Sequence, residues 1–350
     1  MRVGEEDRVK VLRLVEAGRD LEAQHLPEPE VGPEEVLVEI KAAGICRSDM
    51  HYRAGTRPVP RLPLTPGHEI AGVVRRTGAD VSAITSGDRV CIHYLVTCGN
   101  CEQCRRGGEQ FCISGEMVGL DRDGGYAELV GVPGRNVLPL PEAVSFEAGA
   151  VLMCSSATAF HALRRGRLRP GESVAVFGVG GLGMSAVQLA AAFGALDVFA
   201  VDIEPGKLAT AASYGAVPID AREGDPGEQI RRVTGGRGVD VALDLVGSPE
   251  TMRSVIDALA VSGRAVAVAV TQRPVGVDPF WDLVQREAEV VGSADHLASE
   301  LPTLIELARR GTLDLSRVVT RTVPLEVAAV NEALDRLAAF GSDVRTVIIP

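Results

Sequence analysis

One short stretch of the chain contains four residues that could do chemistry together: Cys46, Ser48, Asp49 and His51. A cysteine thiolate with nitrogen or sulfur partners suits zinc, and a zinc site with an open position polarises an oxygen bound there. A hydroxyl and an imidazole nearby could carry the released proton to water. A cysteine in a glycine-flanked turn is also often a small core residue, so the metal interpretation needs further ligands elsewhere in the chain.

Two later positions offer such ligands, namely His68 in the run Gly67-His68-Glu69, and Cys154. His68 ends a predicted turn and begins a predicted strand, so its ring could face inward beside Cys46. It could also be a hydrogen-bonded core histidine, but the candidate thiolate favours a ligand. Glu69 and Asp49 would then support the ligands, because ligating imidazoles usually donate their second N–H to an acceptor.

Four further cysteines are grouped in one loop, with two, two and seven residues between them: Cys98, Cys101, Cys104 and Cys112. This spacing can close a tetrahedral zinc site that has no open position, which predicts a structural ion. An iron–sulfur cluster, a redox pair and unrelated core thiols are the alternatives. A zinc knuckle can also belong to a nucleic-acid module, but the acidic chain and the lack of interleaved aromatic residues argue against that here.

A glycine-rich loop begins at Gly178, between a predicted strand at 173–177 and a predicted helix at 184–193. In the G-x-G-x-x-G pattern the first glycine allows a tight turn, the second lets the backbone approach a pyrophosphate, and the third lets the helix pack on the strand. The pattern is formed by Gly178, Gly180 and Gly183. Asp202 ends the next predicted strand, where a carboxylate accepts the adenosine ribose hydroxyls. A doubly wound sheet for another ligand is the alternative.

Strands alternate with helices after about residue 170, and six predicted strands with five crossovers make a complete doubly wound sheet. The strands are expected at 173–177, 197–201, 216–220, 239–246, 264–270 and 288–291. The first 150 residues instead contain short strands between proline and glycine clusters. These are typical of a barrel-like β region, with strands expected at 9–15, 35–40, 69–74 and 89–92.

The C-terminal tail lies beyond the six-strand set and contains predicted helices at 297–310 and 327–339 and a strand at 344–349. We expect the tail to rejoin the first domain. The catalytic domain would then be discontinuous, comprising 1–153 and 293–350, with a nucleotide domain at 154–292 and a cleft between the two.

Length and charge limit the classes of function. A chain of 350 residues suggests about two domains, and a net charge of −11 argues against nucleic acid as the main partner. The apolar runs are short and no basic-then-apolar leader is present, so we expect no membrane segment and a cytoplasmic protein. In that compartment seven cysteines indicate metal or thiol chemistry rather than disulfides.

Together these motifs resemble the zinc-dependent medium-chain alcohol dehydrogenases over essentially the whole chain. The shared features, in the family's order, are Gly44-x-Cys46-x-Ser48-Asp49, Gly67-His68-Glu69, the four-cysteine loop, Cys154 and the glycine loop. The resemblance implies an α/β protein in which a GroES-like β-barrel catalytic domain is joined to a six-stranded Rossmann domain.

The resemblance also implies two zinc ions per chain. Cys46, His68 and Cys154 match the catalytic ligands, and Glu69 matches a carboxylate that can approach the metal. Ser48 matches the hydroxyl that touches the substrate alcohol, and His51 the outer end of the proton relay. The four-cysteine loop matches the structural zinc site.

NAD is the cofactor that the resemblance implies. Its expected contacts are the loop residues Gly178, Gly180, Gly181, Leu182 and Gly183, the pyrophosphate ligands Arg47 and Arg345, Thr158 against the nicotinamide, and Asp202 with Lys207 at the ribose. Tyr94 falls where the family has an aromatic pocket wall. Tyr94, Met117 and Trp281 together suggest an apolar pocket.

The leading hypothesis is an enzyme that exchanges a hydride between NAD and an alcohol/carbonyl pair at zinc. The competing hypothesis is a zinc-free reductase, or a structural or regulatory nucleotide binder. Family members of that kind lack the catalytic ligands, which are all in place here. The expected partner is a small-molecule alcohol or carbonyl substrate, and the apolar pocket suggests a medium or aromatic alcohol. Bacterial members of the family are commonly tetramers and other members are dimers, so the resemblance implies a homo-oligomer, a tetramer or otherwise a dimer.

Overall fold

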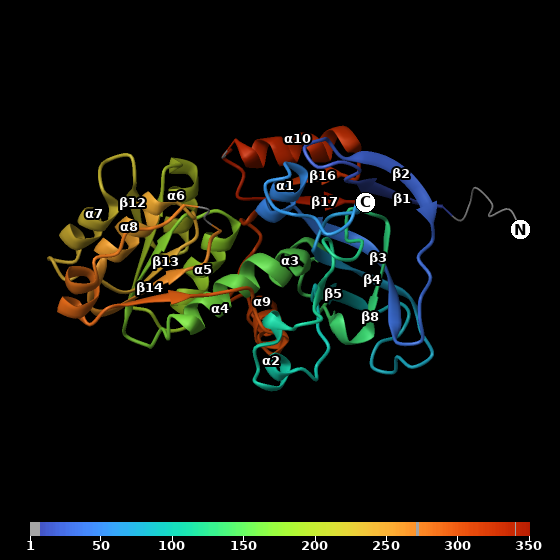
Figure 1. Ribbon diagram of the computed structural model, residues 1–350, viewed down its shortest axis with the longest axis horizontal. Coiled ribbons are helices and arrows are strands. Elements are labelled where there is room, and N and C mark those ends of the chain that lie inside the picture. The colour runs from blue at the N-terminus through green and yellow to red at the C-terminus, as the bar shows by residue number, and fades with distance from the viewer. Residues whose placement is uncertain (1–7, 271–272, 340) are drawn as a thin grey trace, which may run out of the picture. The chain divides into compact units, whose positions relative to one another are not determined.

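A computed structural model of the protein describes residues 8–270, 273–339 and 341–350 (Figure 1). Contacts divide the chain into two units. Unit 1 comprises Met1–Cys154, Leu297–Arg309 and Val319–Pro350, and unit 2 comprises Ser155–His296 and Arg310–Val318. The predicted limits placed Cys154 in the nucleotide domain and kept 293–296 and 310–318 with the tail. Contacts instead place Cys154 in unit 1 and both of those segments in unit 2.

Unit 1 is built on a seven-stranded, largely antiparallel sheet with the order β16-β17-β3-β4-β5-β9 and with β8 paired to β3. Its strands are β3 (Glu35–Gly44), β4 (Glu69–Thr77), β5 (Arg89–Ile92), β8 (Leu129–Pro133), β9 (Val137–Pro139), β16 (Val319–Pro324) and β17 (Arg345–Ile349). Two strand pairs lie outside this sheet: β1 (Arg8–Arg13) with β2 (Glu22–Pro27), and β6 (Leu95–Val96) with β7 (Glu116–Met117). The β-rich character predicted for the first region is confirmed.

The C-terminal strand β17 lies antiparallel to β3, with Val347 opposite Gly44, so the tail is part of the sheet that leads to the first candidate ligand. The helices of unit 1 are α1 (Arg47–Arg53), α2 (Glu102–Arg105), α3 (Phe146–Val151), α9 (Leu301–Arg309) and α10 (Val327–Ala338). The expected helix at 297–310 is a 3₁₀ turn, η7 (Ala298–Glu300), followed by α9. One core unites β3, β4, β17 and α10 through buried side chains such as Leu37, Ile70, Ile348 and Leu334.

Unit 2 contains a six-stranded parallel sheet with the order β12-β11-β10-β13-β14-β15. The strands are β10 (Ser173–Phe177), β11 (Asp197–Asp202), β12 (Val217–Asp220), β13 (Val239–Asp244), β14 (Leu259–Ala267) and β15 (Glu289–Gly292). The helices are α4 (Ala157–Arg165), α5 (Gly181–Ala192), α6 (Pro205–Ser213), α7 (Pro226–Val233) and α8 (Pro249–Asp257). The strand order reverses between β10 and β13, which is where doubly wound sheets bind ligands. The predicted Rossmann fold is confirmed.

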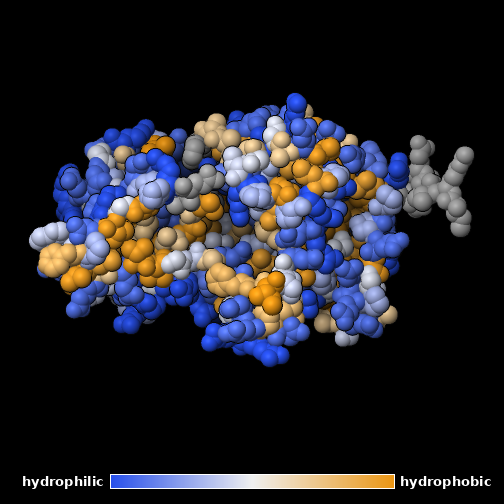
Figure 2. All heavy atoms as spheres, viewed as in Figure 1, coloured by the Kyte–Doolittle hydropathy of each residue, from blue (hydrophilic) through white to orange (hydrophobic). Residues whose placement is uncertain are grey.

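The last crossover of unit 2 differs from the expected α-helix. Between β14 and β15 the chain forms a π-helical turn, η5 (Pro279–Leu283), and a 3₁₀ turn, η6 (Val284–Arg286). This region exposes large apolar side chains, which gather around the end of unit 2 that carries β14 (Figure 2). In the part of the chain that the structure describes, no helix is both long and apolar enough to span a bilayer.

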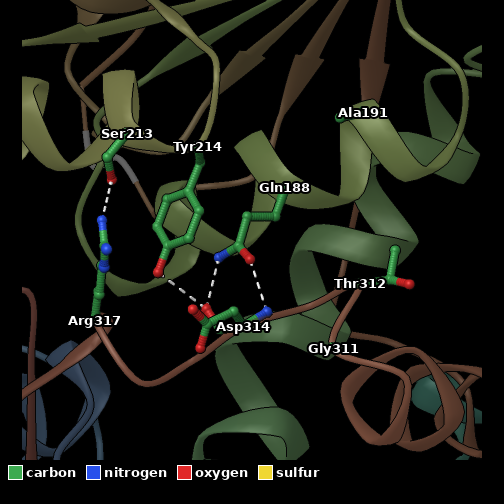
Figure 3. Close-up of a pocket in the computed structure, with 8 residues that line it drawn as sticks. All are labelled: Gln188, Ala191, Ser213, Tyr214, Gly311, Thr312, Asp314 and Arg317. Carbon is green, nitrogen blue, oxygen red and sulfur yellow. Dashed lines mark hydrogen bonds between the residues drawn. The ribbon is translucent and has the colours of Figure 1, made fainter.

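The segment Arg310–Val318 is attached to unit 2 by a small polar cluster (Figure 3). The amide of Gln188 on α5 accepts the N–H of Asp314 at 2.8 Å and donates to the carbonyl of Asp314 at 3.0 Å. The hydroxyl of Tyr214 donates to the same carbonyl at 3.1 Å, and Arg317 donates to Ser213 at 3.0 Å. These bonds satisfy the backbone N–H and carbonyl of Asp314, in a segment whose flanks both belong to unit 1.

Candidate active site

Cys46 lies at the junction between β3 and α1, where its backbone is fixed from both sides. Its N–H donates to Oδ2 of Asp49 at 2.8 Å, and the N–H of Ile45 donates to the carbonyl of Thr346 on β17 at 2.9 Å. A carboxylate in the first turn accepts an otherwise unpaired helix N–H and is favoured by the helix dipole. The sulfur of Cys46 is therefore presented by a rigid strand-to-helix turn.

His68 precedes β4 and is buried, with 1% of its surface exposed. Its Nδ1 lies 3.4 Å from Oδ1 of Asp49, and its ring meets Tyr94 edge-on with the centroids 5.0 Å apart. Gly67 has φ +97°, and a Cβ there would lie 2.5 Å from Cδ1 of Tyr126, so the turn before His68 requires glycine. Because Nδ1 faces Asp49, Nε2 is the nitrogen left for a metal.

Glu69 is fully buried and forms an ion pair with Arg345, which is 8% exposed. A Cβ at Gly44 would collide with the Glu69 carboxylate, which explains the glycine at the end of β3. The resemblance implied a pyrophosphate contact for Arg345. The structure places its guanidinium on Glu69 instead, and the pyrophosphate role stays a prediction.

The side-chain donor atoms of Cys46, His68, Glu69 and Cys154 all lie within 4.8 Å of one another. Cys154 is carried by the π-helical turn η4 (Leu152–Ser156) that follows α3. The sulfurs of Cys46 and Cys154 are 4.0 Å apart. Two thiolates bound to tetrahedral zinc at about 2.3 Å have their sulfurs about 3.8 Å apart, so this donor set fits zinc.

The electrostatics of the cluster also favour a cation. A hydrogen bond from Cys154 lowers the pKa of Cys46 well below its ordinary value; burial opposes this shift, and the charge of His68 adds to it. Burial lowers the pKa of His68, but the charges of Asp49 and Cys46 outweigh this effect and raise it to about 10. A pocket that holds a thiolate and draws a proton onto imidazole is negatively charged, and a divalent cation satisfies the same field.

The four cysteines of the loop form the second donor cluster, again with all four sulfurs within 4.8 Å of one another. Sulfur–sulfur distances of 3.5 Å for Cys101–Cys104 and 4.0 Å for Cys101–Cys112 match the edges of a zinc tetrahedron and exclude disulfides. Backbone N–H groups of Asn100 and Cys101 lower the pKa of Cys98 to about 6, as suits a thiolate ligand. Because the protein supplies all four donors, the cluster fits a structural ion.

The candidate relay lies on α1. Ser48 and His51 are half-buried and three residues apart, and therefore lie on one face of the helix. Nδ1 of His51 lies 2.8 Å from the hydroxyl of Thr56, which itself donates to the carbonyl of His51 at 3.3 Å. In the tautomer whose Nδ1–H donates to Thr56, Nε2 is the basic nitrogen. Burial and the charges of Arg47 and Arg57 lower the pKa of His51, so the ring is neutral at pH 7.

The glycine loop of unit 2 has the form of a phosphate cradle. Gly178 has φ +91°, and a Cβ at Gly183 would collide with the carbonyl of Gly178. A Cβ at Gly180 would meet nothing within 4 Å, so the backbone there faces open space at the N-terminus of α5. Open amides at the start of a long helix bind anions, so the loop fits the pyrophosphate of a dinucleotide. Gly181 and Leu182 form the first turn of α5.

Asp202 ends β11 with its carboxylate fixed by three backbone amides. Oδ2 accepts from Val179 at 2.9 Å, and Oδ1 accepts from Ile203 at 2.8 Å and Glu204 at 3.0 Å. A carboxylate has about four lone-pair positions, so capacity remains for a ribose hydroxyl. Lys207 lies in the first turn of α6 and Thr158 in α4, both half-buried.

The suggested pocket residues occupy different surroundings. Tyr94 is buried, with its hydroxyl 4.0 Å from the sulfur of Cys154, and therefore lines the metal cluster. Met117 accepts the hydroxyl of Tyr52 at 3.9 Å. Trp281 lies in η5 of unit 2, 66% exposed and edge-on to Phe280. The sequence carried no signal that separated these environments.

Two family models match the chain. Residues 32–142 match the alcohol dehydrogenase GroES-like domain, and residues 181–310 match the zinc-binding dehydrogenase domain. An NAD-dependent alcohol dehydrogenase of Sulfurisphaera tokodaii is 35% identical over 98% of this chain and 100% of that protein. An alcohol dehydrogenase of Rhizobium meliloti is 37% identical over 85% of this chain and 87% of that protein.

Solved structures agree with these matches. The alcohol dehydrogenase of Aeropyrum pernix superposes with a TM-score of 0.88 at 34% identity, covering 97% of this chain and 100% of that one. A zinc-binding dehydrogenase of Sinorhizobium meliloti bound to NADP gives a TM-score of 0.90 at 29% identity, covering 98% and 99%. The chain therefore belongs to the zinc-binding dehydrogenases with a GroES-like domain, the family of the zinc-dependent medium-chain alcohol dehydrogenases.

Proposed function

We propose that this enzyme interconverts alcohols with ketones or aldehydes by hydride exchange with NAD, at a zinc ion held by Cys46, His68 and Cys154. The observation that carries the proposal is that these three donors, which come from distant parts of the sequence, lie together around one point. The sulfurs of Cys46 and Cys154 are 4.0 Å apart. Glu69 supplies a further donor in the same cluster, backed by Arg345.

When bound, zinc would supply a Lewis acid for the substrate oxygen, and NAD the acceptor of the hydride. The protein's own groups move the proton. The hydroxyl of Ser48 receives the proton of the alcohol, and Nε2 of His51 takes it onward, because a lowered pKa leaves the ring neutral at pH 7. Thr56 fixes the opposite nitrogen of the ring, and the half-buried position of His51 lets the proton leave to solvent.

Asp202 supports NAD rather than NADP in this chain. NADP carries a phosphate of roughly −1.5 to −2 charge at the 2′ position, where it would meet a carboxylate. The next residue, Ile203, is 57% exposed and offers no positive charge to that phosphate. The glycine loop receives the pyrophosphate, with Arg47 as a further candidate contact.

The substrate is a small-molecule alcohol or its carbonyl partner. Relatives of similar identity include a sorbitol dehydrogenase of Bacillus subtilis at 32% and a butanediol dehydrogenase of the same species at 29%. Because these relatives are named for different substrates, a panel of alcohols, diols and polyols with NAD is the test, read by the absorbance of the reduced cofactor. The proposal expects turnover that Cys46→Ser abolishes. Turnover that Cys46→Ser leaves at the wild-type level would contradict it.

The loop of four cysteines supports a second, structural zinc in the same chain. All seven cysteines lie among the described residues, and none of them is in a disulfide. Reduced cysteines support the cytoplasm as the compartment of the protein.

We further propose that the enzyme is a homo-oligomer joined through the β15 edge of unit 2. β15 is the edge strand of its sheet, and exposed apolar side chains lie along the adjoining turns and strands: Val261, Phe280, Trp281, Val284 and Val290. Large exposed apolar patches beside an open strand edge are typical of protein interfaces.

Light scattering after size exclusion tests this interface. Trp281→Asp with Val290→Lys should reduce the mass to that of one chain. Leu196→Lys is the control, because Leu196 is 77% exposed just before β11, on the other side of the sheet. A double variant that keeps the wild-type mass would exclude this edge.

A further inference from the structure

One buried carboxylate lies behind the ring of His68. Nδ1 of His68 is 3.4 Å from Oδ1 of Asp49, and each of these two residues is 1% exposed. The acceptor behind a ligating imidazole fixes the tautomer and the orientation of the ring. The Asp49 carboxylate, paired with Nδ1 at 3.4 Å, therefore helps to aim Nε2 of His68 at the metal.

The second oxygen of Asp49 is occupied by two donors. Oδ2 accepts the backbone N–H of Cys46 at 2.8 Å and the hydroxyl of Tyr126 at 2.9 Å. Two donors on one oxygen set the plane of the carboxylate and turn Oδ1 toward His68. Of the two donors, only that of Tyr126 comes from a side chain.

Tyr126 is itself rigidly placed, with none of its surface exposed. Its N–H donates to the carbonyl of Pro66 at 3.0 Å, and its carbonyl accepts the N–H of Leu12 at 2.8 Å. Its ring fills the space over Gly67, where a Cβ would lie 2.5 Å from Cδ1. One residue thus packs on the backbone that leads into His68 and bonds the carboxylate behind the His68 ring.

We propose that Tyr126 is a positioning residue for His68 that acts through Asp49. The proposal rests on the metal centre proposed above. Without the hydroxyl, the Asp49 carboxylate loses one of the two donors that hold its plane, and the hold on His68 weakens. Groups behind ligating histidines contribute roughly 10- to 100-fold in metal affinity, which sets the expected effect.

Tyr126→Phe removes the hydroxyl and keeps the ring. Tyr52→Phe is the matched control, because Tyr52 is also buried in unit 1 but its hydroxyl donates to the sulfur of Met117 at 3.9 Å. The holoenzyme is titrated with a chelator while zinc bound per chain is counted. We expect the catalytic zinc of Tyr126→Phe to bind about 10-fold or more weakly, and Tyr52→Phe to match the wild type.

Asp49→Asn separates positioning from packing. If Tyr126 acts through the carboxylate, adding Tyr126→Phe to Asp49→Asn weakens zinc binding by less than about twofold further, whereas independent effects multiply. Cobalt-substituted Tyr126→Phe should also show a shifted ligand-field absorption band, since the geometry of His68 changes. Wild-type zinc affinity in Tyr126→Phe, or full multiplication of the two losses, overturns the proposal. A wild-type enzyme that binds only one zinc would instead overturn the metal centre itself.

Discussion

His51 is the residue whose protonation most directly limits the proposed relay. Burial and the positive charges of Arg47 and Arg57 lower its pKa, so it accepts a proton at pH 7 and loses this ability as the pH falls through that lowered value. We expect His51→Gln to slow alcohol oxidation by roughly 10- to 100-fold near neutral pH. This is below the 10²–10⁴ range of direct acid–base groups, because water can substitute.

The pH dependence of that loss distinguishes the relay from a packing role. Hydroxide can accept the proton at high pH, so the deficit of His51→Gln should shrink as the pH rises. Steady-state rates between pH 6 and 10 measure it. A deficit of constant size across this range would assign His51 to packing around Thr56 instead.

At the same scale, the sequence predicted residues with distinctive chemistry and missed their supports. Cys46, His68 and Cys154 were candidates by residue type and became the predicted ligand set through the family resemblance, and the structure brings their donor atoms together. Tyr126 was missed because a tyrosine far along the chain carries no signal of a bond to Asp49. The pairing of Arg345 with Glu69 depends on β17 lying beside β3, which side-chain type alone does not reveal.

At the scale of elements, the end of β11 determines the choice of nucleotide. Each pair of like unit charges at about 4 Å and an effective dielectric near 20 costs on the order of 4 kcal/mol, and screening reduces the total to about 2–4 kcal/mol. That corresponds to roughly 30- to 1000-fold preference for NAD in kcat/KM. Asp202→Ser with Ile203→Arg should relax or reverse the preference and leave the alcohol profile unchanged. Kinetics with both nucleotides decide it; a wild-type enzyme equally fast with NADP would remove the role given to Asp202.

The attachment of Arg310–Val318 to α5 gives a second prediction about an element. Gln188 is 6% exposed, and its side-chain amide bonds both the N–H and the carbonyl of Asp314. Gln188→Leu leaves that peptide without these partners, and we expect unfolding to become easier by about 1–3 kcal/mol. Tyr214→Phe removes a single bond to the same carbonyl and should cost less. Denaturant unfolding measures both, and equal losses would contradict the ranking.

Elements with strong periodicity were predicted well. The strands β5 and β10 have the expected limits, because each is a short and largely buried apolar run. β14 begins at Leu259 rather than at 264, since its early part includes Ser262 at φ +57° and a shift in register with β13. β2 and β16 were missed because both are largely exposed and lack apolar alternation.

At the scale of the whole molecule, the two metal clusters serve different purposes. The four-cysteine loop includes α2 and η2 (Glu109–Phe111), which are short and bury no side chain, so little apolar packing holds it. A structural zinc contributes folding free energy directly in such a loop. Cys101→Ser should therefore lower the thermal stability of the protein. Thermal unfolding measures this loss independently of substrate turnover.

The zinc content of the purified protein tests the account most directly. By elemental analysis we expect two zinc ions per chain in the wild type and about one in Cys46→Ser or Cys154→Ser. Both variants should stay folded and bind NAD through unit 2, while alcohol turnover is lost. If Cys46→Ser retains both zinc ions and near-native activity, the assignment of Cys46, His68 and Cys154 as the catalytic zinc ligands is wrong.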